Sequence, residues 1–201
     1  MKNPLRKRLP RELVGDLSKY LVVFLFMTLT IGMISGFLVA DDSMLQAYNE
    51  SFEKYNIEDG NFTLAAEADD ALIDEIEKSD VTVYEHFYLE QKTEKGVDST
   101  LRIFKERDKV DLVCLMDGEM PASEDEIALD RMYAKNNDLA IGDAVTIGGT
   151  EYTISGLVAL SDYSALFSNN GDMMFDAVKF GVAIVTEAGF DSFDLDTIRY
   201  N

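Results

Sequence analysis

The amino-acid sequence predicts an α+β fold, in which an N-terminal transmembrane helix continues into a stalk and a mixed helix and strand domain of one or two lobes follows. Three observations support this prediction: residues 21–40 carry no charge, residues 44–55 keep a helical apolar period, and short strand-like and helix-like runs fill the remainder. The sequence therefore divides into a leader (1–20), a transmembrane helix (21–40), a stalk helix (41–57) and a folded domain (58–201).

The run Leu21–Ala40 has the length and composition of a membrane span. At about 1.5 Å per residue it forms a helix of about 30 Å, the thickness of the hydrocarbon core of a bilayer. Twelve of its residues are Leu, Ile, Val or Phe, and these offset the polar Thr28, Thr30 and Ser35. We therefore expect this run to insert into a membrane.

The distribution of charge predicts the orientation of the span. The leading 20 residues hold six of the 18 Lys and Arg and two of the 38 Asp and Glu, so the N-terminus should be cytoplasmic. The segment after Ala40 holds the remaining 12 basic and 36 acidic residues, a net charge of −24. We expect this acidic segment to lie outside the cytoplasm, and its charge argues against a nucleic-acid partner.

A cleaved signal peptide is the alternative interpretation of the same segment. The apolar core of a signal peptide usually runs for about 7–15 residues and ends in a small-x-small cleavage site. Here the run is longer, and Leu38 stands where the first small residue would be needed. Both interpretations place the acidic segment outside the cytoplasm, and we favour the uncleaved anchor.

A leucine pattern precedes the span. Leu9, Leu13 and Leu17 recur at helical spacing among basic residues, which predicts an amphipathic helix at the cytoplasmic interface of the lipid. A basic leader without structure of its own is the alternative.

Small residues repeat every four positions within the span, as Thr28, Gly32, Gly36 and Ala40. Small side chains let two helix backbones approach closely in a membrane. This face is therefore the candidate surface for packing against other membrane helices.

The folded domain is expected to contain strands at 62–64, 81–89, 99–104, 112–116, 127–129, 145–147, 152–160 and 180–185, with helices at 65–77 and 131–137 and a further helix starting at Thr186. Leu112–Met116 is apolar on both faces, which predicts a central, buried strand that ends at Asp117-Gly118. Gly148-Gly149 predicts the turn of a hairpin. In the helix at 65–77, Leu72, Ile73 and Ile76 should point inward.

The sequence contains no recognisable catalytic, cofactor or metal site. It lacks the G-x-x-x-x-G-K-[ST] pattern, so any ATP hydrolysis requires a partner chain. His86 is the only histidine and Cys114 the only cysteine, which leaves zinc, Ser-His-Asp and Cys-His sites without enough members. We expect Cys114 to be buried in the core and His86 to face solvent. The acidic runs 69–70 and 124–126 lack the spacing of a calcium loop.

Several motifs resemble the FtsX-like (MacB-type) permeases of bacterial ABC transporters. The first membrane helix of that family is similar to residues 10–13, 19–21 and 35–38, PREL, KYL and SGFL. The extracytoplasmic domain of the family is similar to the ordered series 118–121, 125–129, Ala134, Leu139, 142–143 and 152–156, which begins GEMP and DEIAL and ends YTISG. Order and spacing, rather than any single motif, carry the resemblance.

The resemblance implies one transmembrane subunit of an ATP-driven transporter, whose external domain lies between the first and second membrane helices. Its expected partners are a cytoplasmic ABC ATPase subunit, the remaining permease helices or a second permease copy, and membrane lipid. No further apolar span follows residue 40, so we expect either a truncated permease or helices supplied by another chain. The lone cysteine fits a bacterial cell membrane better than a disulfide-rich eukaryotic surface.

Two other functions compete with a non-enzymatic transporter subunit. A single-pass anchored binding or sensor module is the main alternative, and an anchored hydrolase, which would lack a recognisable nucleophile and base, is the second. The residues indicate no transported substrate, no direction of transport and no oligomeric state.

Overall fold

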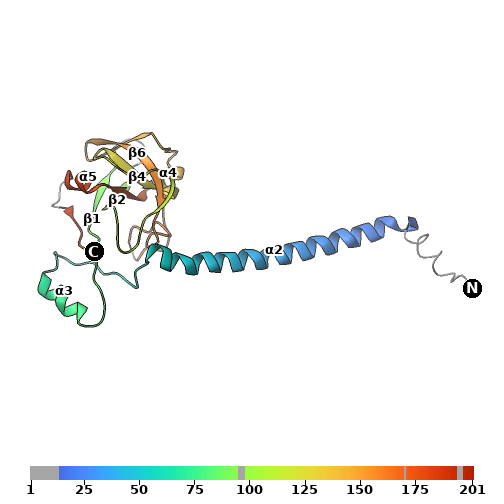
Figure 1. The fold of residues 1–201 in the computed structure, drawn as a ribbon. Helices are drawn as coiled ribbons and strands as arrows, with labels where there is room; N and C mark the ends of the chain where they lie inside the picture. The colour runs from blue at the N-terminus through green and yellow to red at the C-terminus, as the bar shows by residue number, and fades with distance from the viewer. Residues whose placement is uncertain (1–13, 95–97, 170, 194–196) are drawn as a thin grey trace, which may run out of the picture. The chain divides into compact units, whose positions relative to one another are not determined.

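The computed structural model describes residues 14–94, 98–169, 171–193 and 197–201. It confirms the α+β fold class, because a long helix is followed by a mixed sheet with short helices (Figure 1). The chain forms two compact units, Met1–Glu50 and Ser51–Asn201.

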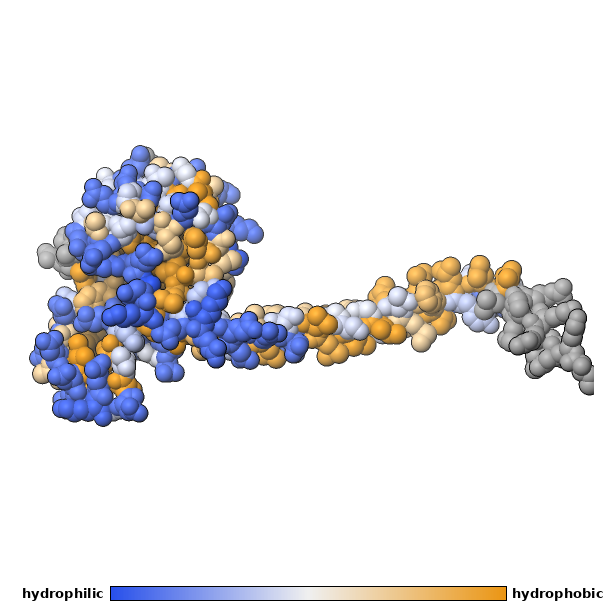
Figure 2. All heavy atoms as spheres, viewed as in Figure 1, coloured by the Kyte–Doolittle hydropathy of each residue, from blue (hydrophilic) through white to orange (hydrophobic). Residues whose placement is uncertain are grey.

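Helix α2 (Leu17–Tyr55) supplies the described part of the first unit. By length and composition it is the one helix among the described residues that could cross a membrane, with a mean hydropathy of 2.3 in its most apolar stretch. The side chains of that stretch are exposed, including large ones such as Phe24, Phe26 and Leu29 (Figure 2). Leu9 and Leu13 of the predicted interfacial helix lie outside the described residues, and Leu17 begins α2.

The second unit is built on one mixed sheet. In the described residues it has seven strands: β1 (Tyr88–Lys92), β2 (Thr100–Lys105), β3 (Cys114–Gly118), β4 (Glu126–Asp130), β5 (Ala144–Ile147), β6 (Thr150–Ala159) and β7 (Phe180–Val185). Their order is β1-β2-β7-β4-β6-β3, and β5 also pairs with β6. The pairs β2–β7 and β4–β6 are parallel, while the other pairs are antiparallel.

Strand β7 is the centre of the hydrophobic core. All six of its residues are buried between β2 and β4, as expected for an uninterrupted apolar run covered on both faces. Gly181 of β7 has the ring of Tyr133 packed where a β-carbon would lie. Tyr133 is itself buried, so this glycine allows the helix that carries Tyr133 to approach the sheet closely.

The predicted hairpin between β5 and β6 is confirmed. The strands pair antiparallel from Ile147–Thr150 outward, and Gly148 and Gly149 both have positive φ, of 56° and 82°. Two successive positive φ values are the requirement of a tight type I′ hairpin turn, which explains the glycine pair.

Polar side chains cap the short helices. Asp69 accepts a hydrogen bond from the backbone N–H of Leu72 at the start of α3 (Asp70–Glu77). Asp130 does the same for the first turn of α4 (Arg131–Asn136). Thr186 caps α5 (Glu187–Asp191), as its position in the sequence predicted. Such caps satisfy N–H groups that the first turn of a helix leaves without partners.

The predicted central strand at 112–116 is wrong. The strand that forms there, β3, lies at the end of the strand order and retains Asp117 and Gly118, and its Leu115 and Met116 are 42% and 44% exposed. Apolar residues on both faces are therefore compatible with an edge strand, and the buried centre is taken by β7, whose run is longer.

The predicted elements between 62 and 89 also differ from the structure. Residues 81–87 alternate in hydropathy but form no strand, and β1 starts only at Tyr88. The strand at 62–64 is reduced to one bridge between Leu64 and Tyr200. Helix α3 begins at Asp70 instead of residue 65, because Asp69 caps it, and Leu72 is exposed rather than inward. A segment of alternating apolar and polar residues forms a strand only where a neighbouring segment of the chain supplies hydrogen bonds.

Gly181→Ala should destabilise the second unit by about 1–3 kcal/mol, because the added methyl group would displace the Tyr133 ring from a filled core. Urea unfolding of the full chain in detergent would measure this. Gly60→Ala is the matched control, since nothing lies within 4 Å of its β-carbon position. Equal stability of the two variants would contradict the packing role assigned to Gly181.

Candidate functional site

The predicted packing stripe lies on the exposed surface of α2. Thr28, Gly32, Gly36 and Ala40 are all exposed in the first unit. A β-carbon added at Gly32 or Gly36 would meet nothing within 4 Å, so both positions leave room for another helix. No contact within the described residues uses or tests this surface, and its packing role stays a prediction.

A second candidate site lies where α2 ends. Asn56 has a left-handed backbone conformation, with φ of 45°, and the backbone N–H of Ile57 donates to the carbonyl of Phe52 at 3.1 Å. This is the pattern with which a left-handed residue stops a helix. The last turn of α2, from Ser51, belongs to the same compact unit as the sheet.

The end of the helix is hydrogen-bonded to the segment 109–114, and we name these contacts the joint. The backbone N–H of Leu112 donates to the carbonyl of Tyr55 at 2.8 Å, and that of Asp111 donates to the carbonyl of Asn56 at 3.0 Å. The Asn56 side-chain amide donates to the carbonyl of Lys109 at 2.6 Å. The Tyr55 hydroxyl lies 2.8 Å from Cys114 Sγ. The first two of these contacts use backbone on both sides, so they depend on helix geometry rather than on residue type.

Cys114 and His86 do not lie as predicted. Cys114 is half-buried on the edge strand β3 rather than in the core. His86 is half-buried, and burial, followed by the positive charge of Arg107, lowers the pKa of its imidazole. Neighbouring carboxylates of Asp111, Asp162 and Asp108 oppose that shift.

A buried ion pair supports the joint. The guanidinium of Arg107 donates two hydrogen bonds of 2.9 Å to the two carboxylate oxygens of Asp162. Only 2% of the Arg107 side chain and 13% of the Asp162 side chain are exposed. The guanidinium also lies 4.4 Å from the centre of the Phe104 ring and donates to the backbone carbonyl of Asp111 at 3.4 Å. It therefore connects β2, the joint and the segment after β6.

Asp111 is the least exposed charged residue of the joint. It is fully buried and has a positive φ of 48°, a conformation that Asp tolerates better than most residues. Its Oδ1 accepts hydrogen bonds from the backbone N–H of Glu58 at 3.1 Å and from the hydroxyl of Ser161 at 3.2 Å. Asp111 thus holds the chain that leaves α2 against the chain that leaves β6.

Glu58 lies beside this buried carboxylate. Burial, followed by the charges of Asp111 and Asp162, raises the pKa of the Glu58 carboxyl, while a hydrogen bond from Asn61 opposes the shift. Glu58 and His86 also line a hollow of about 750 Å³ in the second unit. This hollow is a candidate space for a small ligand.

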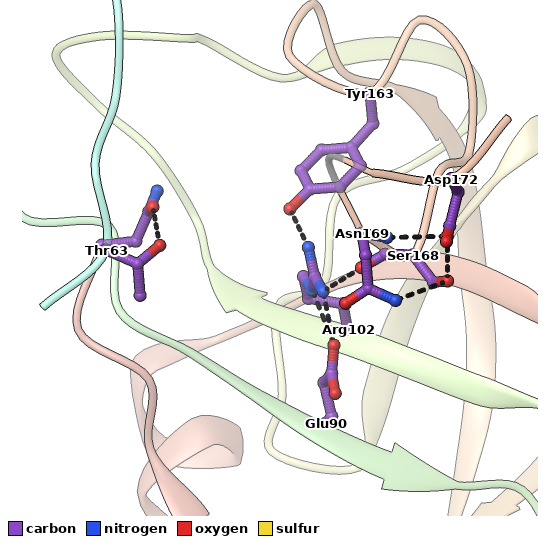
Figure 3. Close-up of polar contacts among 8 residues, drawn as sticks. Thr63, Glu90, Arg102, Tyr163, Ser168, Asn169 and Asp172 are labelled. Atoms are coloured by element: carbon purple, nitrogen blue, oxygen red, sulfur yellow. Dashed lines mark hydrogen bonds and ion pairs between the residues drawn. The ribbon is translucent and has the colours of Figure 1, made fainter. Parts of the chain in front are cut away.

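A second arginine fixes the loop between β6 and β7 (Figure 3). Arg102 of β2 donates to the Tyr163 hydroxyl at 2.9 Å, to the Ser168 carbonyl at 2.8 Å and to the Glu90 carboxylate at 3.0 Å. Asp172 accepts a hydrogen bond of 2.7 Å from the Ser168 hydroxyl. Each nitrogen of the guanidinium is used within the chain, so this cluster is structural.

The described residues contain no group of three or more His, Cys, Asp or Glu side chains arranged to hold a metal ion. Carboxylates of the acidic runs named above instead accept hydrogen bonds from backbone N–H groups. Asp69 caps α3, and Glu126 accepts hydrogen bonds from the N–H groups of Ala122 and Ser123.

A scan against protein-family models gave no match, and a search of curated proteins gave none either. Among solved structures, the extracellular domain of the noncanonic ABC-type transporter YknZ from Gram-positive bacteria is similar at 12% identity, covering 69% of this chain and 74% of that one, with a TM-score of 0.36. The periplasmic region of MacB from Actinobacillus actinomycetemcomitans is similar at 9% identity, covering 65% and 63%, with a TM-score of 0.37. Both come from ABC-type transporters.

Those two structures belong to the class that the sequence motifs resemble. At 9–12% identity and TM-scores of 0.36 and 0.37, this likeness carries no conclusion about what this chain does. The functional conclusions therefore rest on the residues of this chain.

Sequence reasoning missed the joint. The charged residues in and around it, Glu58, Arg107, Asp111 and Asp162, are far apart in the chain and stand among many other acidic residues. No spacing marks them, and only the fold brings them together. The one local signal was Asn56, a residue typical of helix ends, immediately after the apolar period of the stalk.

Arg107→Met should destabilise the second unit by about 3–5 kcal/mol, because it leaves the Asp162 carboxylate buried without a partner. Chemical denaturation of the full chain in detergent would measure the change. Lys105→Met is the matched control, since Lys105 pairs with Asp191 on the surface and such pairs contribute about 0–1 kcal/mol. Similar losses for both variants would contradict the supporting role of the buried pair.

Proposed function

We propose that this chain is part of the permease subunit of an ATP-driven ABC transporter in a bacterial cell membrane. Its N-terminus lies in the cytoplasm, α2 crosses the membrane between about residues 21 and 40, and the acidic domain 58–201 lies outside. A cytoplasmic ABC ATPase and further permease helices are its partners. The chain itself catalyses no reaction.

One observation carries this proposal: the helix that contains the uncharged run 21–40 continues without a break to Tyr55 and ends in the joint. An unbroken helix can transmit a shift or rotation of its membrane part to the residues bonded to its end. A passive anchor needs neither helical continuity beyond the bilayer nor a buried charge cluster at the end of the helix. The motifs that resemble FtsX-like permeases add independent support.

The alternative is an anchored binding or sensor module, and the hollow lined by Glu58 and His86 favours it. The two functions differ in their partners. A transporter subunit requires an ATPase and additional membrane helices, whereas a binding module can act with α2 alone.

The location can be tested by protease treatment of intact cells that carry the full chain with an N-terminal tag. We expect the domain 58–201 to be digested and a tagged fragment of the leader and span to survive, because the bilayer protects it. The same treatment after permeabilisation should also remove the tag. Survival of the whole chain in intact, protease-accessible cells would contradict the external placement.

The partnership can be tested by replacing Gly32 and Gly36 together with Leu. If the stripe packs against other permease helices, the two bulky side chains should prevent close approach, and the ABC ATPase that we propose as a partner should no longer co-purify with the chain. Thr30→Leu adds a similar side chain on the opposite face of the helix and should leave co-purification unchanged. Absence of any ATPase from the wild-type complex would overturn the transporter proposal and favour the anchored module.

A further inference from the structure

One oxygen atom of the joint is left without a hydrogen-bond partner. Asp111 is fully buried, and while its Oδ1 accepts two hydrogen bonds, its Oδ2 accepts none within the described structure. A buried acceptor without a partner costs about 1–3 kcal/mol, and more when it is charged. The position therefore requires a donor that can reach the oxygen.

Glu58 is the group placed to supply that donor. Its backbone N–H already binds Asp111 Oδ1, and a side-chain hydrogen bond with Asp111 is among the causes that raise the pKa of the Glu58 carboxyl. Two carboxylates cannot hydrogen-bond to each other, but a carboxylic acid and a carboxylate can. Glu58 also lines the hollow beside the joint, so a proton from solvent can reach it.

We propose that Glu58 and Asp111 share one proton, and that binding of this proton stabilises the joint at the end of α2. The Glu58 hydroxyl then donates to Asp111 Oδ2, which satisfies the buried oxygen and removes the repulsion between two adjacent negative charges. The proton belongs to the pair rather than to either residue alone.

The surrounding charges favour one shared proton. Arg107 is the buried cation nearest to the pair, and both of its terminal nitrogens are committed to Asp162. One of them also donates to the backbone carbonyl of Asp111, while Nε is buried without a partner, so within the described residues neither carboxylate of the pair receives a hydrogen bond from Arg107. The other titratable groups near here are His86, whose pKa is lowered by burial and then by Arg107, and Asp108, which is exposed. Adjacent carboxylates in a buried site favour the singly protonated state.

The sign of the pH effect follows from the raised pKa of Glu58. The folded joint binds the proton more tightly than the unfolded chain does. The stabilisation that this proton provides is complete below 4.5, the ordinary pKa of a glutamate. It is lost as the pH rises through the raised pKa of Glu58 in the folded chain. The contribution of this proton to the joint is therefore largest below that ordinary value and decreases as the pH rises through the raised one.

Hydrogen exchange of the full chain in lipid nanodiscs tests this proposal. The amides of Glu58, Asp111 and Leu112 donate across the joint and report its opening. Their rates in wild type should be divided by those in Glu58→Gln at the same pH, so that the intrinsic pH dependence of exchange cancels. The side-chain amide introduced by Glu58→Gln donates at every pH. We therefore expect the ratio of exchange rates to be constant below about pH 4.5. Above that pH it should rise about tenfold per pH unit, and it should level off once the pH exceeds the raised pKa of Glu58.

Two further variants sharpen the result. Asp111→Asn removes the second charge while keeping a residue that tolerates positive φ, and it should abolish the rise. Glu75→Gln, at an exposed glutamate of α3, changes the net charge equally and should keep the wild-type profile. A ratio to Glu58→Gln that stays flat with pH would overturn the shared proton.

A direct titration keeps the proposal testable should Glu58→Gln fail to fold. The carboxyl carbon of Glu58 in the wild-type chain, followed by NMR, should titrate at higher pH than that of Glu75. A midpoint equal to or below that of Glu75 would overturn the proposal. None of these measurements involves an ATPase, so their failure would leave the transporter proposal standing.

Discussion

The second unit depends on how a buried arginine is neutralised where α2 ends. Arg107 comes from the segment that follows β2 and Asp162 from the segment that follows β6, so their pairing joins two segments that are far apart in the chain. A lone buried charge is costly, so neither residue tolerates loss of the other. The backbone of Asp111 is fixed by the same guanidinium, and through it the last residues of α2 acquire a defined place.

The core and the joint are stabilised by different means. Around β7 the side chains are apolar and closely packed. At Gly181 the absence of a side chain allows the helix that carries Tyr133 to lie against the sheet. At the joint, most contacts are hydrogen bonds and ion pairs with defined directions. Apolar packing is not directional, whereas hydrogen bonds have preferred directions and so help to fix the orientation of a helix end. An element that must pass on a movement needs the second kind of attachment.

The sequence predicted those features that local pattern controls. The uncharged run, the hairpin at Gly148-Gly149, the cap at Thr186 and the strand 180–185 all depend on neighbouring residues, and the structure agrees with them. The buried centre of the sheet could not be predicted, because both 112–116 and 180–185 are apolar and only the strand order separates them. The charged residues in and around the joint could not be predicted either. In the sequence they look like any other acidic or basic residue, and only the fold brings them together and buries them.

The composition of the joint bears on the choice between a transporter subunit and a static anchor. A static attachment is most stable when the end of the helix is packed with apolar residues, since replacing buried ion pairs by such packing is often neutral or stabilising. This chain instead places Arg107, Asp162, Asp111 and Glu58 together at the helix end and leaves an oxygen of Asp111 without a partner in the described structure. That arrangement costs stability and fixes the orientation of the helix end. If the chain is the transporter subunit proposed above, a fixed orientation would let α2 pass a movement to the domain, whereas a helix that only tethers a domain needs no such attachment.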